Sequence, residues 1–242
     1  MKGKIAGLYI MIIFAVSCSK DSCPLSSGNT STQLRDLPYF REIILYDKIN
    51  LILKPDSVQK IMVEAGTHIL SGISTTVNGD QLTVQDNSGC KMLRTDGNTV
   101  NVYISTGGLE KISYHGAGNI ISTDTIRQTH FTIDCDEGSG SINLKLVADS
   151  VDAIIRTRNA DISLGGHGHY ALLYCAGEGS INLSQFTTHD LQIESTSIRD
   201  NTVNVTDSLY ASILYLGNVY YSGSPVYIQS KISSSGKLIP LP

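Results

Sequence analysis

Apolar and polar residues alternate over short runs along most of the chain, and segments containing glycine separate these runs. Val, Ile and Leu dominate the runs at Ile49–Leu53, Gln81–Val84 and Thr99–Ile104. A period of two, bounded by turn residues, is typical of β-strands with one buried face. No window of about 11–18 residues keeps the 3,4 spacing of an amphipathic helix. The pattern therefore predicts an all-β protein with little helix.

The second half of the chain repeats one short unit, in which a turn is followed by an aliphatic residue. Six segments share it: Gly116–Ile120, Gly138–Ile142, Arg158–Ile162, Gly177–Ile181, Arg199–Val203 and Tyr215–Val219. The closing aliphatic recurs after 22, 20, 19, 22 and 16 residues, or about 20 per repeat. A period this short is below that of a propeller blade or a helix pair. It predicts a parallel β-helix, or solenoid, of about 20 residues per coil.

Each position of the repeat has a predicted role. The glycines are expected where the chain turns with φ > 0, and Asn159, Asp200 and Asn201 replace glycine in two turns. The small polar residues before the aliphatics should form a ladder on the coil surface: Asn119, Ser141, Asp161, Ser180, Thr202 and Asn218. The aliphatics should stack inside as one apolar column: Ile120, Ile142, Ile162, Ile181, Val203 and Val219.

The N-terminus predicts export and lipid attachment. Lys2 and Lys4 precede 12 apolar residues, Ile5–Val16, which suits a signal peptide but is shorter than the roughly 20 residues of a membrane span. The run ends at Cys18 in a pattern resembling a lipobox; the alternative is an ordinary signal peptide with an incidental cysteine. We predict a signal peptide over 1–17, a lipidated flexible tether over 18–37 that binds the membrane through Cys18, and a solenoid domain over 38–242.

The net charge restricts the possible partners, and the positions of two cysteines indicate whether they form a disulfide. A net charge of −4 with no basic stripe argues against a nucleic-acid partner. Cys135 and Cys175 occupy similar positions two coils apart, with Arg156 about level between them. Two coils span about 9.6 Å, which exceeds the roughly 7 Å limit on the Cα separation in a disulfide. Both thiols are predicted to be free.

Several of these motifs together resemble the GIN domain, the head of a family of auto-transporter adhesins found in Gram-negative envelope lipoproteins. The resemblance rests on the lipobox, Phe40-x-x-Ile43, the Gly-x-Gly-x-Ile repeats and Tyr221-Ser-Gly223-Ser-Pro225, and it covers residues 38–242. It implies a right-handed β-helix similar in shape to pectin lyases, without a recognised catalytic set, and a role in adhesion at the cell envelope or outer membrane. The turns at 158–161 and 199–202 depart from the glycine pattern.

Two groups of residues could carry chemistry on such a scaffold. Asp134, Asp136 and Glu137 precede one turn, and Arg156 and Arg158 fall at about the same place one coil later. Carboxylates that hold a cation beside an arginine base would suit the elimination of uronates. The alternative is a solvated ion pair between coils, and we favour it.

A pair of histidines could bind a metal. His167 and His169, two residues apart, could chelate an ion, but no third ligand is apparent in the sequence, so an exposed turn is preferred. No catalytic residue, metal or cofactor is predicted.

A group of tyrosines near the C-terminus is the best binding feature: Tyr210, Tyr215, Tyr220, Tyr221 and Tyr227. Stacked coils could align these rings for a glycan or protein ligand, or the rings could cover the open end of the core. Three functions stay open. They are a non-enzymatic lipid-anchored binding or adhesion head, a carbohydrate-active enzyme resembling a polysaccharide lyase, and a structural envelope protein that self-assembles as a homo-oligomer.

Overall fold

The computed structural model describes residues 26–89 and 99–242. The predicted signal peptide, Cys18 and the first part of the predicted tether lie outside the described residues. The described part is almost entirely β, with one short 3-10 helix, η1 (Leu70–Gly72). No helix in it is long and apolar enough to cross a membrane.

Short strands make up the first half of the described chain, and long strands dominate the second half. The first half contains β1 (Thr30–Arg35), β2 (Glu42–Asp47), β3 (Ile49–Lys54), β4 (Lys60–Gly66), β5 (Ile73–Asn78), β6 (Gln81–Asp86), β7 (Val100–Ser105) and β8 (Lys111–Gly116). The second half contains β9 (Ile120–Cys135), β10 (Ser141–Ile155), β11 (Asp161–Gly177), β12 (Ser180–Ser197), β13 (Asn201–Ile213), β14 (Val219–Ser222), β15 (Tyr227–Ile232) and β16 (Leu238–Pro240).

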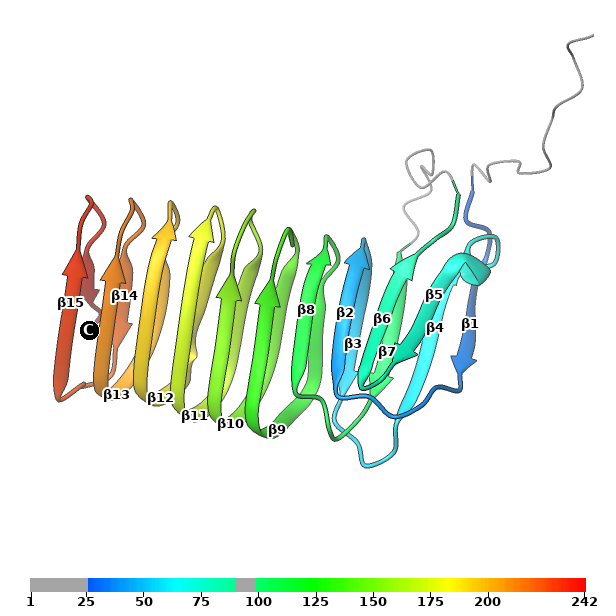
Figure 1. Ribbon diagram of the computed structural model, residues 1–242, viewed down its shortest axis with the longest axis horizontal. Coiled ribbons are helices and arrows are strands. Elements are labelled where there is room, and N and C mark those ends of the chain that lie inside the picture. Colours follow the sequence, from blue (N-terminus) through cyan, green and yellow to red (C-terminus); the bar gives the residue numbers. More distant parts are fainter. Residues whose placement is uncertain (1–25, 90–98) are drawn as a thin grey trace, which may run out of the picture.

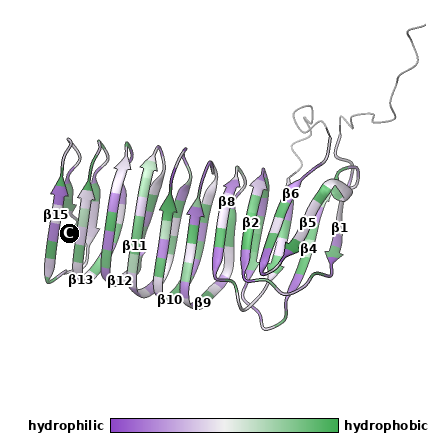
Figure 2. Ribbon diagram, in the orientation of Figure 1, coloured by the Kyte–Doolittle hydropathy of each residue, from purple (hydrophilic) through white to green (hydrophobic). Residues whose placement is uncertain are grey.

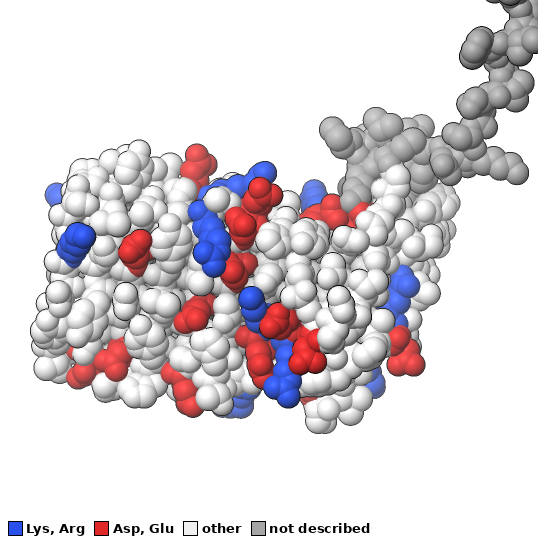
Figure 3. Space-filling view, in the orientation of Figure 1, with Lys and Arg blue, Asp and Glu red and all other residues white. Residues whose placement is uncertain are grey.

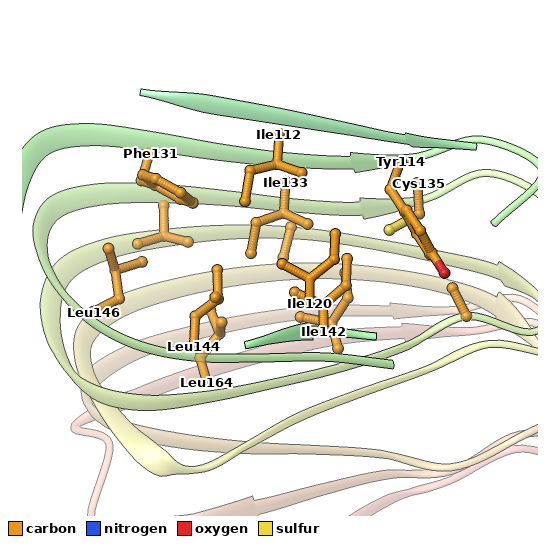
Figure 4. Close-up of a cluster of buried hydrophobic side chains, with 14 of the residues drawn as sticks. Ile112, Tyr114, Ile120, Phe131, Ile133, Cys135, Ile142, Leu144, Leu146 and Leu164 are labelled. Carbon is orange, nitrogen blue, oxygen red and sulfur yellow. The ribbon is translucent and has the colours of Figure 1, made fainter. Parts of the chain in front are cut away.

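The long strands form successive coils of a parallel solenoid (Figure 1). Each long strand contributes two legs joined by a bend, so that every coil is a flattened U with its core between the legs (Figure 4). On one leg Ile142 pairs with Ile120 and Ile162. On the other leg Ile155 pairs with Cys135 and Cys175. These partners are 20 to 22 residues apart, which confirms the predicted coil length and parallel stacking.

The core consists of columns of apolar side chains that run along the stack. Burial alternates along each strand, and Figure 2 shows the matching alternation of hydrophobic and hydrophilic positions. Ile120, Ile142, Ile162 and Ile181 are at most 1% exposed and occupy consecutive levels of one column. Figure 4 shows Phe131 and other residues of the opposite leg facing this column. A single coil could not bury these side chains, so neighbouring coils share the stabilisation.

The predicted column is wrong at its fifth member. Asn182 pairs with Thr202, which makes Asn201 level with Ile181 and shifts Val203 by two residues. Asn201 is fully buried; its side-chain oxygen accepts from the Ile181 amide at 2.8 Å, and its amide nitrogen donates to Ser195 Oγ at 3.1 Å. These bonds satisfy a polar group that would otherwise be costly inside the core. The column resumes at Val219, the partner of Asn201.

The polar ladder is also confirmed only in part. Ser141 Oγ donates to Asn119 at 2.9 Å, and Ser180 Oγ donates to Asp161 at 2.6 Å. Thr202 is level with Asn182 and so lies outside this ladder. The residue level with Ser180 is instead Asp200. Its carboxylate accepts a hydrogen bond from the backbone N–H of Asn218 at 2.7 Å.

The repeat glycines serve a different purpose from the one predicted. Among the glycines of the repeat turns, Gly177 alone has a positive φ (70°), whereas Asn159, Asp200 and Asn201 do not adopt positive φ. A Cβ on Gly118 would collide with the Ile49 backbone oxygen, and a Cβ on Gly140 would collide with that of Gly118. These glycines therefore let the turns of adjacent coils approach closely, which is the second general use of glycine.

The N-terminal part of the solenoid is less regular. The coil containing β2 and β3 lies between β8 and β6 on one leg, and between β9 and β7 on the other, so the order in space differs from the order in sequence. The pairs β1/β4, β4/β7 and β5/β6 are antiparallel. The predicted flexible tether is wrong over β1, which forms a six-residue ladder with β4. The sequence does not predict β1 because its side chains are polar or exposed, so that no apolar pattern marks the strand. Backbone hydrogen bonds to β4 stabilise it instead.

We expect removal of one column residue to destabilise the protein strongly. Ile162→Ala should lower the free energy of unfolding by about 2–5 kcal/mol, because the neighbouring coils cannot close the cavity. Urea denaturation followed by circular dichroism measures the change. Ser163→Ala, on the outward-facing next residue, should change the free energy by no more than about 0.5 kcal/mol. Equal effects of the two variants would contradict the column.

Candidate binding surface

The last coil exposes residues that correspond to buried positions in earlier coils. Ile228 pairs with the buried Leu209, and Ile232 pairs with the buried Ile213. Yet Ile228 is 42% exposed and Ile232 is 46% exposed. Every residue of β15 is exposed, because no further coil of the described chain covers it. The apolar core thus reaches the surface at this end of the stack.

Two of the predicted tyrosines lie together beside this end. The rings of Tyr210 and Tyr227 have centroids 5.5 Å apart and planes tilted by 49°, and both side chains are nearly half exposed. The Tyr227 hydroxyl donates to Gln229 Oε1 at 3.0 Å, which orients its ring. The two tyrosines take outward-facing positions of this leg, whereas Ile228 and Ile232 take inward-facing ones. We call Tyr210, Tyr227, Ile228 and Ile232 together the C-terminal surface.

The other three tyrosines do not join this pair. Tyr215 is exposed beside Leu216 in the turn after β13. Tyr220 and Tyr221 belong to β14, which pairs with the first leg of β13, and Tyr221 packs against the core. The aligned ladder that we considered for all five rings is therefore limited to Tyr210 and Tyr227.

The C-terminal end carries few charges. Residues 208–242 contain two charged side chains, Lys231 and Lys237. Figure 3 shows Lys, Arg, Asp and Glu gathered over the middle of the stack on the visible face, with far fewer toward its C-terminal end. An apolar and aromatic surface with little charge is typical of the centre of protein interfaces.

The acidic group considered for catalysis forms an ion pair between coils. Arg156 donates to Asp134 through Nε at 2.8 Å and through a terminal nitrogen at 3.1 Å. The hydrogen bond to Asp134 is the main cause of the raised pKa of Arg156. The favoured alternative, a solvated ion pair, is confirmed.

The histidines are arranged differently from the predicted pair. His169 lies beside His189 and Asp190 of the next coil, and His167 is not part of this group. One coil is about 20 residues long, so the repeat places His189 level with His169, and Asp190 follows His189 in the sequence. The group could therefore have been predicted from the repeat. The prediction paired His169 with its chain neighbour His167 rather than with the histidine one coil later.

The two buried cysteines are free, as predicted. Ile155, rather than Arg156, lies level between them. Burial raises the pKa of the Cys175 thiol to about 11 and raises the pKa of Cys135 further. Both side chains therefore act as small apolar core residues.

A match between the sequence and a known family model identifies the family of the chain. Residues 39–225 match the family model described as "Putative auto-transporter adhesin, head GIN domain". The chain belongs to this family. The matched residues span the coils from β2 to β14 and end just before β15. No curated protein sequence matches the chain.

Solved structures share the architecture of this GIN domain. A "putative adhesin" from Bacteroides fragilis superposes with a TM-score of 0.83 at 18% identity, covering 89% of this chain and 99% of that one. A "putative adhesin" from Parabacteroides merdae gives 0.67 at 17% identity, covering 89% and 98%. A "putative lipid binding protein" from Parabacteroides distasonis gives 0.63 at 17% identity, with the same coverage. At these identities the likeness shows the fold alone.

The GIN domain should protect its two buried thiols from alkylation. In the native protein at pH 8, N-ethylmaleimide should leave Cys135 and Cys175 unmodified, because the thiols are buried and their raised pKa keeps the reactive thiolate scarce. In urea both should react. Mass spectrometry of the two peptides measures this. Rapid native labelling of either thiol would contradict its place in the core.

Proposed function

We propose that this protein is a non-enzymatic binding head, held at the cell envelope by a lipid on Cys18, and that the C-terminal surface binds a polypeptide partner. The observation that carries the proposal is the exposure of Ile228 and Ile232 at core positions, beside the contacting rings of Tyr210 and Tyr227. Large apolar and aromatic side chains that are exposed together mark interaction sites.

The backbone of β15 favours a polypeptide over a glycan. Among the described strands β15 pairs with β13 alone, so its second edge has backbone N–H and C=O groups available. An extended segment of a partner could pair with this edge as a further strand. Alternate side chains of that segment would then cover Ile228 and Ile232.

The position of the surface suits a tethered head. Figure 1 shows β1 and β15 at opposite ends of the stack. A lipid on Cys18 would hold the end that carries β1, and the C-terminal surface would point away from the membrane. The family description and two of the similar structures refer to adhesins rather than enzymes, which agrees with this arrangement. Outer-membrane residence is part of the proposal and is supported by the resemblance to Gram-negative envelope lipoproteins, since the lipobox indicates lipid attachment alone.

Binding by the full chain should depend on the C-terminal surface. Immobilised fibronectin, laminin and collagen, a displayed peptide library and a glycan array supply the probes. We expect a polypeptide to bind, and Tyr210→Ala with Tyr227→Ala to weaken that binding at least about tenfold, because buried aromatic anchors dominate interfaces. Ile228→Lys should weaken it further by placing a charge in the contact.

Tyr46→Ala is the matched control. Tyr46 is also exposed, but it lies on β2 in the other half of the solenoid, where it stacks on His115, so its removal should leave binding unchanged. Light scattering separates self-association from binding of a different protein. The proposal fails if binding survives the double tyrosine variant, if only glycans bind, or if no probe binds.

A further inference from the structure

Two histidines and an aspartate converge at the bend between the legs of β11 and β12. The register pairs Gly168 with Thr188 and Tyr170 with Asp190, which makes His169 level with His189 in consecutive coils. Their rings meet edge to face, with centroids 4.9 Å apart and planes at 88°. The solenoid itself therefore brings two imidazoles together from residues 20 positions apart.

The ligand atoms are spaced for one small ion. His189 Nδ1 lies 3.1 Å from Asp190 Oδ2, and His169 Nδ1 lies 3.9 Å from the same oxygen. One ligand atom from each of the three residues lies within 4.8 Å of those of the other two. Two ligands at 2.0–2.1 Å from a tetrahedral zinc ion are roughly 3.3 Å apart. Small rotations of the exposed histidine side chains would bring all three atoms to that spacing.

The charges around the bend favour a cation. Ser208 is level with Asp190 in the next coil, and its hydroxyl donates to Asp207 at 2.9 Å. Asp149 precedes Ser150, the partner of Tyr170 in the preceding coil. Carboxylates thus lie on the coils at both sides of the histidine pair.

We propose that His169, His189 and Asp190 bind a divalent transition-metal ion, with Zn²⁺ the best match, and that water completes its coordination. Two imidazoles with one carboxylate suit Zn²⁺, Ni²⁺ or Cu²⁺, whereas Ca²⁺ and Mg²⁺ prefer all-oxygen sites. The bound ion would join the bends of two consecutive coils. Because side chains of the protein fill only three positions, one position remains open to a ligand from solution.

The site shares no residue with the C-terminal surface, although it lies close to it. Asp190 is level with Ser208, which lies two residues before Tyr210, and Ser208 is level with Tyr227. The binding of an ion by the three ligands can be tested without any polypeptide partner.

Titration of the full chain with Zn²⁺ tests the proposal directly. After removal of metal by a chelator, calorimetry should show one equivalent bound at the cluster. His169→Ala, His189→Ala and Asp190→Asn should each lower the affinity by at least about 100-fold, since even loss of a residue that only supports a ligand costs 10–100-fold. His167→Ala, two residues away and outside the cluster, should leave the affinity unchanged.

Two further measurements distinguish loss of the ligands from loss of the fold. Co²⁺ should give a visible absorption spectrum of nitrogen and oxygen ligands, which the His169→Ala/His189→Ala double variant abolishes. Circular dichroism checks the fold of each variant; His189→Gln replaces His189→Ala if the latter does not fold. The proposal is overturned if the double variant binds Zn²⁺ as well as the parent, if His167→Ala has the same effect as His169→Ala, or if Ca²⁺ binds the cluster as tightly as Zn²⁺.

Discussion

Each coil from β9 to β13 depends on the backbone hydrogen bonds that it shares, in parallel register, with the coils on either side. That register sets Ile142 between Ile120 and Ile162, and Ile155 between Cys135 and Cys175. It closes the core, because a single coil leaves its inward side chains exposed. Where the described coils end, Ile228 and Ile232 show what an uncovered column looks like. The same register brings together residues about 20 positions apart on the outer surface.

Much of the solenoid could be predicted because aliphatic residues recur in the sequence at the coil length. The prediction failed where the register between two coils shifts or where a polar residue takes an interior position. Asn201 takes an interior level through two hydrogen bonds, and hydropathy alone cannot indicate a satisfied polar core residue. β1 is held by backbone pairing rather than by an apolar face. Cys135 and Cys175 were placed correctly because their spacing matches two full coils.

The candidate sites were also hard to predict, because closeness along the chain does not indicate closeness in space. Tyrosines close in sequence separate onto different legs, so Tyr210 contacts Tyr227 while Tyr220 and Tyr221 lie elsewhere. Conversely, His169 and His189 are distant in sequence and adjacent in space. In a solenoid, surface chemistry follows columns across coils rather than neighbours along the chain. The sparsely charged C-terminal surface and the histidine cluster at the bend are therefore two different sites, made of different residues on neighbouring coils.

Crosslinking of outward-facing neighbours tests the register most directly. Asn143 pairs with Ser163, and adjacent strands lie about 4.8 Å apart, within the Cα range of a disulfide. Asn143→Cys with Ser163→Cys should therefore form a disulfide on mild oxidation, identified by peptide mass mapping. Lys145→Cys with Ser163→Cys, offset by two residues to roughly 8 Å, should not. Crosslinking of the offset pair in preference to the level pair would contradict the parallel, in-register stack.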